Sequence, residues 1–374
     1  MSVIDHLYRK LKNRKADDNY RSLELKPELI DFTSNDYLGL ARNTELHQSI
    51  LRKLQNMPNG STGSRLLSGN SELTMETERF LADIFQTDQV LLFDSGYMAN
   101  LAILSTVPQK GDTVLYDELA HACIKDGIRL SLAQKLSFKH NDLLDLKRKL
   151  KKATGNIYVA VESVYSMDGD QCPLLELVDL VIEFKAKIIV DEAHSTGIYG
   201  RNGAGLCDHL GLSDHIFARI LTFGKAMGIH GAAIAGNDKL CHFLVNFARP
   251  FIYTTAPAPY AVIVAKTSFE YIVKHQRLQK KIKEKVSFFI EHYYARGLDK
   301  KLNRIRSDHP IQSILIPGNE KVKYISKSLQ ESGFDVRPIL SPTVALGKER
   351  IRICIHTFNT KTEISGLVDR LATI

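Results

Sequence analysis

The chain has 374 residues, 44% of them hydrophobic and 25% charged, and a formal net charge of +8. These proportions are ordinary for a soluble globular protein, the length suits two packed domains, and no apolar run approaches a membrane span. The lysines and arginines are scattered, and no nucleic-acid-binding motif accompanies them. We therefore expect no nucleic-acid or membrane partner, and read the charge as attraction of an anionic substrate or as simple solubility.

The five cysteines lie apart, without the CxxC spacing of a metal site or the pattern of a disulfide framework. They predict a reducing cytoplasm and no bound metal. The first fifteen residues, MSVIDHLYRKLKNRK, lack the apolar core of a secretory signal. We thus expect a cytoplasmic location.

The N-terminal part predicts a helix followed by turn-rich segments. Residues 3–15 carry apolar side chains at helical spacing among basic ones. FTSNDYLGLARN, residues 32–43, predicts a short strand and then a turn around Asn35. Formation of an Asx turn would be a sufficient structural reason for an asparagine at this position. GSTGSRLLSGN, residues 60–70, is a loop that opens a helix, and by itself it is weak evidence for phosphate binding.

Two strand–turn–helix units follow. VLLFDSGYMANLA, residues 90–102, predicts a helix whose first amides, those of Gly96 and Tyr97, point at an anion. An ordinary connection between a strand and a helix, with no bound anion, would have the same sequence pattern. Residues 112–127 predict another strand and a helix that begins just after His121. A single histidine at a helix start is more often a cap or a core residue than a ligand-binding group.

The central stretch carries the main chemical signal. Ile188, Ile189 and Val190 predict a buried parallel strand that ends on Asp191, with His194 three residues later, and ligands bind at the carboxyl ends of such strands. LTFGKAMGIHG, residues 221–231, sets Lys225 among glycines. An aldehyde cofactor needs an amine and a pyridine nitrogen needs a carboxylate, so this order favours pyridoxal phosphate. Taken singly, the three residues would be a strand-end acid, a surface lysine and a structural histidine.

The C-terminal part predicts a second domain. ARPFIYTTAPAP, residues 248–259, ends in a proline-rich boundary, and residues 260–296 predict one long charged helix. Beyond it, helices alternate with short strands such as residues 312–316. In residues 351–356, isoleucines alternate with polar residues, which puts Arg352 on the face opposite Ile351 and Ile353.

The motifs VDEAHSTG, TFGKA and NDYLGL together resemble the α-oxoamine synthases, a pyridoxal-phosphate-dependent family with the aminotransferase class I/II fold. The resemblance implies an α/β protein of fold type I, in which helices flank a mostly parallel sheet in a large domain and a smaller α+β domain follows. It implies an N-terminal segment at residues 1–37, a cofactor-binding domain at 38–270 and a C-terminal domain at 271–374. It also implies a homodimer with shared active sites.

The family's site residues are carried over onto matching positions. The resemblance implies catalytic roles for Lys225, His121, Asp191 and His194. It implies cofactor binding by Gly96, Tyr97, His121, Ser166, Asp191, His194, Thr222 and Lys225, and by Thr254 and Thr255 reaching a neighbouring subunit. It implies substrate binding by Arg21, Asn35, His121, Thr343 and Arg352. His230 has no role that the resemblance explains.

The family condenses an amino acid with an acyl thioester and releases CO₂. NDYLGL, ARPFIYTT and IRICIHTFNT are most similar to members that join L-alanine to pimeloyl-CoA, or to a pimeloyl carrier-protein thioester, in biotin synthesis. Glycine C-acetyltransferase is the alternative, ahead of 5-aminolaevulinate synthase and serine palmitoyltransferase. A protein of another class, one that binds the cofactor and regulates without turnover, would also share the fold.

Overall fold

The computed structural model describes residues 3–23, 25 and 28–373. By its internal packing the chain forms two compact units, which are described separately. The larger comprises Asn35–Ser166 and Gln171–Lys280, and the smaller comprises Met1–Ser34, Met167–Asp170 and Lys281–Ile374. The domain boundaries expected after residues 37 and 270 stay a prediction. No helix in the described ranges combines the length and the apolar character that crossing a membrane requires.

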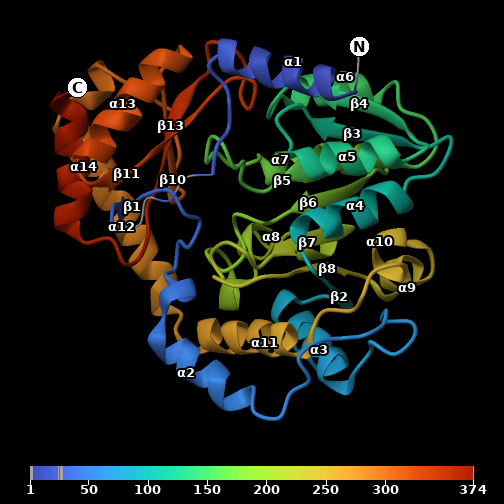
Figure 1. Ribbon diagram of the computed structural model, residues 1–374. Coiled ribbons are helices and arrows are strands. Elements are labelled where there is room, and N and C mark those ends of the chain that lie inside the picture. Colours follow the sequence, from blue (N-terminus) through green and yellow to red (C-terminus); the bar gives the residue numbers. More distant parts are fainter. Residues whose placement is uncertain (1–2, 24, 26–27, 374) are drawn as a thin grey trace. The chain divides into compact units, whose positions relative to one another are not determined.

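A seven-stranded sheet forms the centre of the larger unit (Figure 1). Its strand order is β2-β8-β7-β6-β5-β3-β4, and β8 alone among them runs antiparallel to its neighbours. The strands are β2 (Gln89–Phe93), β3 (Thr113–Asp117), β4 (Gln134–Phe138), β5 (Ile157–Glu162), β6 (Lys187–Asp191), β7 (Ala218–Thr222) and β8 (Ala232–Gly236). The mostly parallel sheet predicted from the sequence is thus confirmed.

Helices cover both faces of this sheet. One face packs against α4, α5 and α9, and the other against α6, α7 and α8. The helices of the unit are α2 (Thr44–Lys53), α3 (Glu72–Phe85), α4 (Gly96–Thr106), α5 (Ala122–Leu130), α6 (Leu143–Leu150), α7 (Leu174–Glu183), α8 (Leu206–His209), α9 (Asp238–Phe247), α10 (Arg249–Ile252) and α11 (Pro259–Lys274). Because both faces are covered, the strands read as continuous apolar runs.

Strand β6 shows how burial fixes the position of the site. Ile188, Ile189 and Val190 are each at most 2% exposed. Burying such a side chain contributes about 1.5–3 kcal/mol, so the register of β6 is held by its own apolar residues. The strand ends on Asp191, next to Glu162 at the end of β5 and Ile220 in β7. The polar residues that follow therefore gather at one edge of the sheet.

The smaller unit contains an antiparallel sheet of order β12-β13-β10-β9 and a separate parallel pair, β1-β11. These strands are β1 (Ile30–Asp31), β9 (Asn303–Arg304), β10 (Ile311–Leu315), β11 (Phe334–Asp335), β12 (Arg337–Ile339) and β13 (Arg350–Cys354), and the helices are α1 (Val3–Ala16), α13 (Asn319–Glu331) and α14 (Lys361–Thr373). The predicted α+β character is confirmed.

Two local predictions are corrected. The strand expected from residue 32 lies earlier, at Ile30–Asp31, because the Asp31 carboxylate accepts the amides of Thr33 (3.0 Å) and Ser34 (2.9 Å) and closes a turn there. The helix expected over residues 260–296 is broken into α11 and α12 (Arg277–Ala295). At the break, Nδ1 of His275 bonds to the Tyr271 carbonyl (2.8 Å), the acceptor that the His275 amide would use in a continuous helix.

Candidate active site

Asp191 lies at the carboxyl end of β6 and is 5% exposed. Its Oδ2 accepts a hydrogen bond from Asn100 Nδ2 at 2.7 Å, and its Oδ1 accepts the amide of Ala193 at 2.9 Å. Asn100 is itself anchored by a bond from Nδ2 to the Gly96 carbonyl (3.0 Å). A buried carboxylate held by neutral donors keeps a fixed orientation, as a partner for a protonated ring nitrogen requires.

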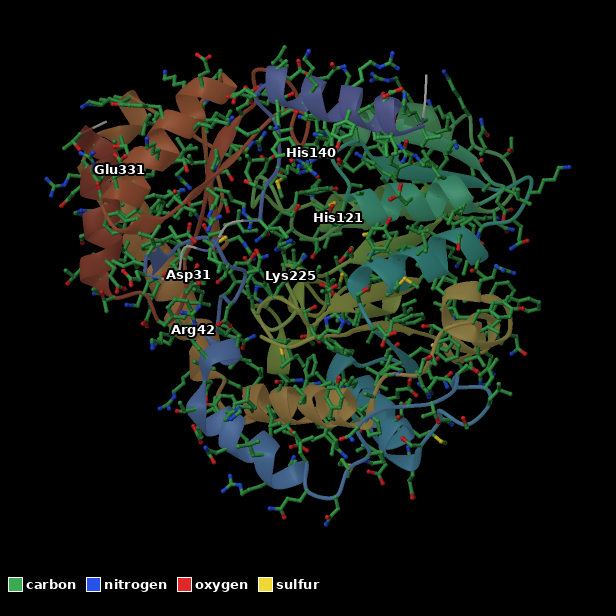
Figure 2. The ribbon with its side chains drawn as sticks, viewed as in Figure 1. Asp31, Arg42, His121, His140, Lys225 and Glu331 are labelled. Atoms are coloured by element: carbon green, nitrogen blue, oxygen red, sulfur yellow. The ribbon has the colours of Figure 1, made fainter. Side chains whose placement is uncertain are left out.

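Lys225 follows β7 in the loop between β7 and β8 and is partly buried. Its Nζ lies 2.8 Å from Nε2 of His194, a side chain that is 2% exposed. The structure thus brings together the lysine and the histidine that sequence analysis singled out. Figure 2 labels Lys225 and His121, which both lie in the larger unit.

Helix α4 begins at Gly96 beside Thr222, the last residue of β7. A Cβ atom on Gly96 would lie 2.2 Å from Thr222 Oγ1, so only glycine allows this approach. Ser95 caps the helix and accepts the amide of Met98 at 3.3 Å. The amides of Gly96 and Tyr97 at the helix start, with the Thr222 hydroxyl beside them, form a cradle that fits a phosphate group. The Tyr97 hydroxyl points elsewhere and donates to Asp126 (2.6 Å).

His121 caps helix α5. Its backbone amide donates to Glu162 Oε1 (2.7 Å), and its Nδ1 accepts the amide of Cys123 (3.2 Å) with the Cys123 sulfur 2.9 Å away. His121 as a whole residue is exposed. Burial lowers the pKa of His121, and Lys225 adds to this effect while Asp191 opposes it. An exposed neutral ring that is held through one nitrogen can stack on a flat cofactor.

Glu162 is a further buried acid, paired with Asp191 on neighbouring strands. It is 3% exposed. Burial, and then the charge of Asp191, raise the pKa of Glu162 to about 8, although Lys225 and the bond from His121 oppose the rise. The two acids therefore differ in their surroundings: Asp191 accepts hydrogen bonds from neutral donors, whereas burial favours the neutral form of Glu162.

Four further predicted residues belong to the larger unit. Asn35 Oδ1 accepts a hydrogen bond from the Tyr37 hydroxyl at 3.0 Å, and Ser166 lies partly buried in the turn after β5. Thr254 lines a small pocket with Arg65 and Asp94. Thr255 is exposed.

Three predicted substrate residues belong to the smaller unit. Arg21 Nη2 donates to Thr343 Oγ1 at 3.1 Å, and both residues are exposed. Arg352 lies in β13, partly buried, with Nη2 3.4 Å from the Thr33 carbonyl. Arg350, on the same face of the strand, is buried and forms an ion pair with Asp168. The two arginines thus differ in their surroundings, although they lie on the same face of β13.

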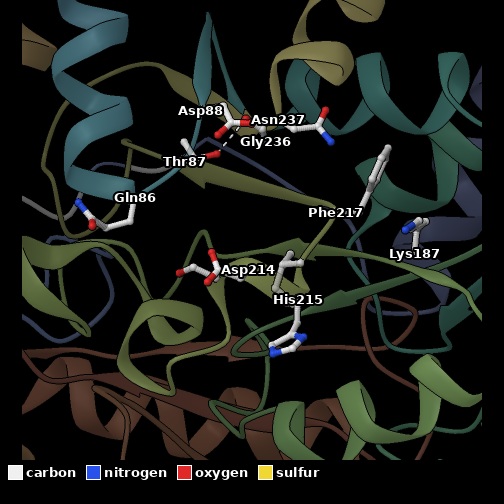
Figure 3. A pocket seen from close by; sticks show the side chains of 11 residues that line it. Gln86, Thr87, Asp88, Lys187, Asp214, His215, Phe217, Gly236 and Asn237 are labelled. Atoms are coloured by element: carbon white, nitrogen blue, oxygen red, sulfur yellow. Dashed lines mark hydrogen bonds between the residues drawn. The ribbon is translucent and has the colours of Figure 1, made fainter.

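A larger pocket lies at the other edge of the sheet (Figure 3). Its volume is about 260 Å³, and its lining includes Asp88, Lys187, Asp214 and His215. Lys187 begins β6, and Gly236 ends the antiparallel strand β8, where its carbonyl accepts the Thr87 hydroxyl (2.8 Å). The pocket is therefore at the amino ends of the parallel strands, away from Asp191 and Lys225.

Sequence reasoning missed residues that support the site. The signal for Tyr37 is its place within the NDYLGL motif. The signal for Glu162 is its place at the end of β5, which matches that of Asp191 at the end of β6. The contacts of Asn100 and Cys123 depend on which helices lie beside the strand ends. That arrangement cannot be read from the sequence.

Known proteins are similar to this chain over almost its whole length. The model of the aminotransferase class I and II family matches residues 27–371. The 8-amino-7-oxononanoate synthase of Emericella nidulans is 37% identical, over 99% of this chain and 95% of that protein. A serine palmitoyltransferase structure from S. paucimobilis has a TM-score of 0.90 at 25% identity, covering 100% and 98% of the two chains. The 8-amino-7-oxononanoate synthase structure from Francisella tularensis has a TM-score of 0.80 at 28% identity, covering 93% and 98%.

The fold, the order of the motifs and these similarities agree. A match to the family model over most of the chain and a full-length relative above 30% identity establish common ancestry. The chain belongs to the aminotransferase class I and II family and, within it, to the α-oxoamine synthases.

Proposed function

We propose that this protein condenses L-alanine with pimeloyl-CoA, or with a pimeloyl carrier-protein thioester, to form 8-amino-7-oxononanoate and CO₂ in biotin synthesis. The chain is an α-oxoamine synthase, an acyltransferase that depends on pyridoxal phosphate. The observation that carries the proposal is one buried arrangement: Asp191 fixed by Asn100 at a strand end, with Lys225 against His194. When bound, the cofactor withdraws electrons from the α-carbon of the amino acid.

The residues divide the work of such a reaction. Lys225 holds the cofactor and then acts as the general base at the alanine α-carbon. Asp191 holds the proton of the ring nitrogen. His194 and Ser166 orient the polar groups of the ring, and His121 stacks on its open face. Gly96, Tyr97 and Thr222 hold the phosphate, for which the cradle at the start of α4 has the right donors.

Substrate contacts complete the proposal. Arg352 grips the alanine carboxylate, because its planar guanidinium suits a two-point contact, whereas the guanidinium of Arg350 is already ion-paired with Asp168. Asn35 and His121 approach the amino acid, while Arg21 and Thr343, already hydrogen-bonded to each other, contact the substrate together.

The choice of substrates rests on sequence rather than on backbone shape. The serine palmitoyltransferase structure superimposes better, with a TM-score of 0.90 against 0.80, which makes that reaction the second candidate. Backbone similarity reports the fold that all these enzymes share, whereas substrate choice depends on side chains. The 37% identity to an 8-amino-7-oxononanoate synthase therefore carries more weight than the better superposition at 25%.

The test is a matrix of amino acids and thioesters with release of free CoA as the signal. L-Alanine, glycine and L-serine are each combined with pimeloyl-, acetyl- and palmitoyl-CoA. We expect the highest kcat/KM for L-alanine with the pimeloyl thioester. Faster release with L-serine and palmitoyl-CoA would support the second candidate. Bound cofactor without turnover in any combination would indicate a regulatory protein instead.

We also propose a cytoplasmic homodimer in which Thr254 and Thr255 of one subunit reach the cofactor phosphate of the other. Tyr253 is 73% exposed and Thr255 is exposed, so the segment has side chains that its own chain does not cover. All five cysteines lie within the described residues and none of them is in a disulfide, which suits a reducing compartment.

A further inference from the structure

A fully buried tyrosine extends the contact between Lys225 and His194. The Tyr37 hydroxyl lies 2.9 Å from His194 Nδ1, on the opposite edge of the ring from the nitrogen that meets Lys225. Tyr37 is 0% exposed and His194 is 2% exposed, so water does not compete freely for these bonds. The two rings pack at a tilt, with centroids 6.2 Å apart.

The direction of the hydrogen bonds follows from counting protons. A tyrosine hydroxyl has one proton, and Tyr37 donates it to Asn35 Oδ1 at 3.0 Å. Its oxygen must then accept from His194, so Nδ1 of His194 carries the ring proton. In a neutral imidazole the other nitrogen has a lone pair, and Nε2 is therefore an acceptor toward Lys225.

We propose, on the basis that Lys225 is the cofactor lysine, that Tyr37 is a positioning residue that sets the tautomer of His194. The consequence concerns the amine. With Nε2 as an acceptor, Lys225 donates an N–H to it, so this contact does not occupy the nitrogen lone pair that attacks. In the opposite tautomer, Nε2–H would donate to that lone pair and occupy it.

This matters for how the chain captures its cofactor. Capture forms a bond between Lys225 Nζ and the aldehyde carbon, and both hydrogens of the neutral amine leave with the aldehyde oxygen as water. The lone pair of Nζ makes the new bond. In the tautomer that occupies this pair, the hydrogen bond from Nε2–H must break before each attack. This slows capture without removing any catalytic group.

The first experiment reads the tautomer in the unsubstituted chain and uses one variant only to identify the signals. The full-length chain is labelled with ¹⁵N-histidine and stripped of cofactor, and the two ring nitrogens of His194 are identified by loss of their signals in His194→Asn. We expect Nδ1 to give the protonated signal and Nε2 the unprotonated one. A protonated Nε2 in the unsubstituted chain would overturn the proposal.

The second experiment removes one oxygen. Tyr37→Phe should allow the Nε2–H tautomer to appear in the spectrum and should slow capture of pyridoxal phosphate, followed by absorbance, by about tenfold, the effect of one hydrogen bond. Tyr293→Phe is the matched control, since Tyr293 is also 0% exposed and donates to a backbone carbonyl, that of Leu302, in the smaller unit. An unchanged tautomer and capture rate in Tyr37→Phe, or an equal loss in Tyr293→Phe, would refute the assignment.

Failure here is separable from failure of the proposed function. The tautomer and the capture rate are measured without alanine or thioester, so they report on Tyr37 whatever the substrates are. A chain that captures cofactor normally but releases no CoA contradicts the proposed reaction and leaves the role of Tyr37 intact. A chain that turns over with His194 in the other tautomer contradicts only the role of Tyr37.

Discussion

At the scale of single residues, the amine of Lys225 is the group on which the proposed chemistry depends. Lys225→Ala should abolish the borohydride-reducible link to the cofactor and nearly all turnover, because its Nζ, 2.8 Å from Nε2 of His194, is the amine proposed to bind the aldehyde. Peptide mapping after reduction locates the link. Lys187→Ala is the control, since Lys187 begins β6 at the opposite edge of the sheet. A reduced label on a lysine other than Lys225 would contradict the assignment.

Two arginines on one strand face give a second prediction. Arg352→Lys should weaken alanine binding by about tenfold or more, because lysine keeps the charge but loses the two-point grip. The thioester should be little affected. Arg350→Lys should lower the free energy of unfolding instead, because Arg350 is buried against Asp168.

The measurement is a titration of alanine, followed through the absorbance of the bound cofactor, in both variants and in the unsubstituted protein. Urea unfolding of the same three proteins gives the stability arm. Weaker alanine binding in Arg350→Lys with normal binding in Arg352→Lys would reverse the two roles.

At the scale of elements, the start of α4 against the end of β7 makes the phosphate cradle. Gly96→Ala should weaken cofactor binding by about tenfold or more, since its Cβ would meet Thr222 Oγ1 at 2.2 Å and must displace either the hydroxyl or the first turn of the helix. Gly60→Ala is the control, because a Cβ there meets nothing within 4 Å. Fluorescence titration with pyridoxal phosphate compares them, and equal affinities in both variants would exclude the cradle.

The ends of β5 and β6 place two acids side by side and make stability depend on pH. The pKa of Glu162 is raised from an ordinary value of 4.5 to about 8. Unfolding lets this carboxyl ionise, so the stability that its neutral form contributes is present below pH 4.5 and is lost as pH rises to about 8. Above that pH the loss should be complete.

Glu162→Gln can still accept the His121 amide, yet it does not titrate. We expect it to be more stable than the unsubstituted protein, by a margin that grows as pH rises from 4.5 to about 8 and then stays constant. Urea unfolding below, within and above this window gives the margin. A margin that is the same at every pH would show that the pKa of Glu162 is the same in the folded and the unfolded protein.

At the scale of the whole molecule, the proposed dimer can be tested by mixing two impaired chains. Lys225→Ala and the double variant Thr254→Ala/Thr255→Ala should each have little activity alone. After the two chains are unfolded and refolded together, half of the dimers are mixed. Each mixed dimer has one intact site, with Lys225 from the double-variant chain and both threonines from the Lys225→Ala chain. About one quarter of the unsubstituted activity should return. If no activity returns although mixed dimers form, each site is built from a single chain.

Much of the architecture was available from the sequence. The run Ile188-Ile189-Val190 ending on Asp191 predicted a buried parallel strand with an acid at its carboxyl end, and burial of those three side chains is what holds β6 in register. Such patterns are legible because periodicity and burial act locally along the chain. The order of the motifs along the chain likewise predicted the family, and the match to the family model confirms that prediction.

Other features were decided by tertiary structure. The break between α11 and α12 depends on the ring of His275 taking the Tyr271 carbonyl, and apolar periodicity does not register a single side-chain bond. The distinction between Arg350 and Arg352 depends on Asp168, far away along the chain.

The sequence by itself determined the strands, the family and the chemical groups at Asp191, His194 and Lys225. What the folded chain decided is how those groups are held: Asn100 against Asp191, and Tyr37 against His194, 157 residues apart. The physical reason is that strand formation is encoded in near neighbours, whereas a hydrogen bond between distant residues exists only after the sheet has brought their strand ends to one edge.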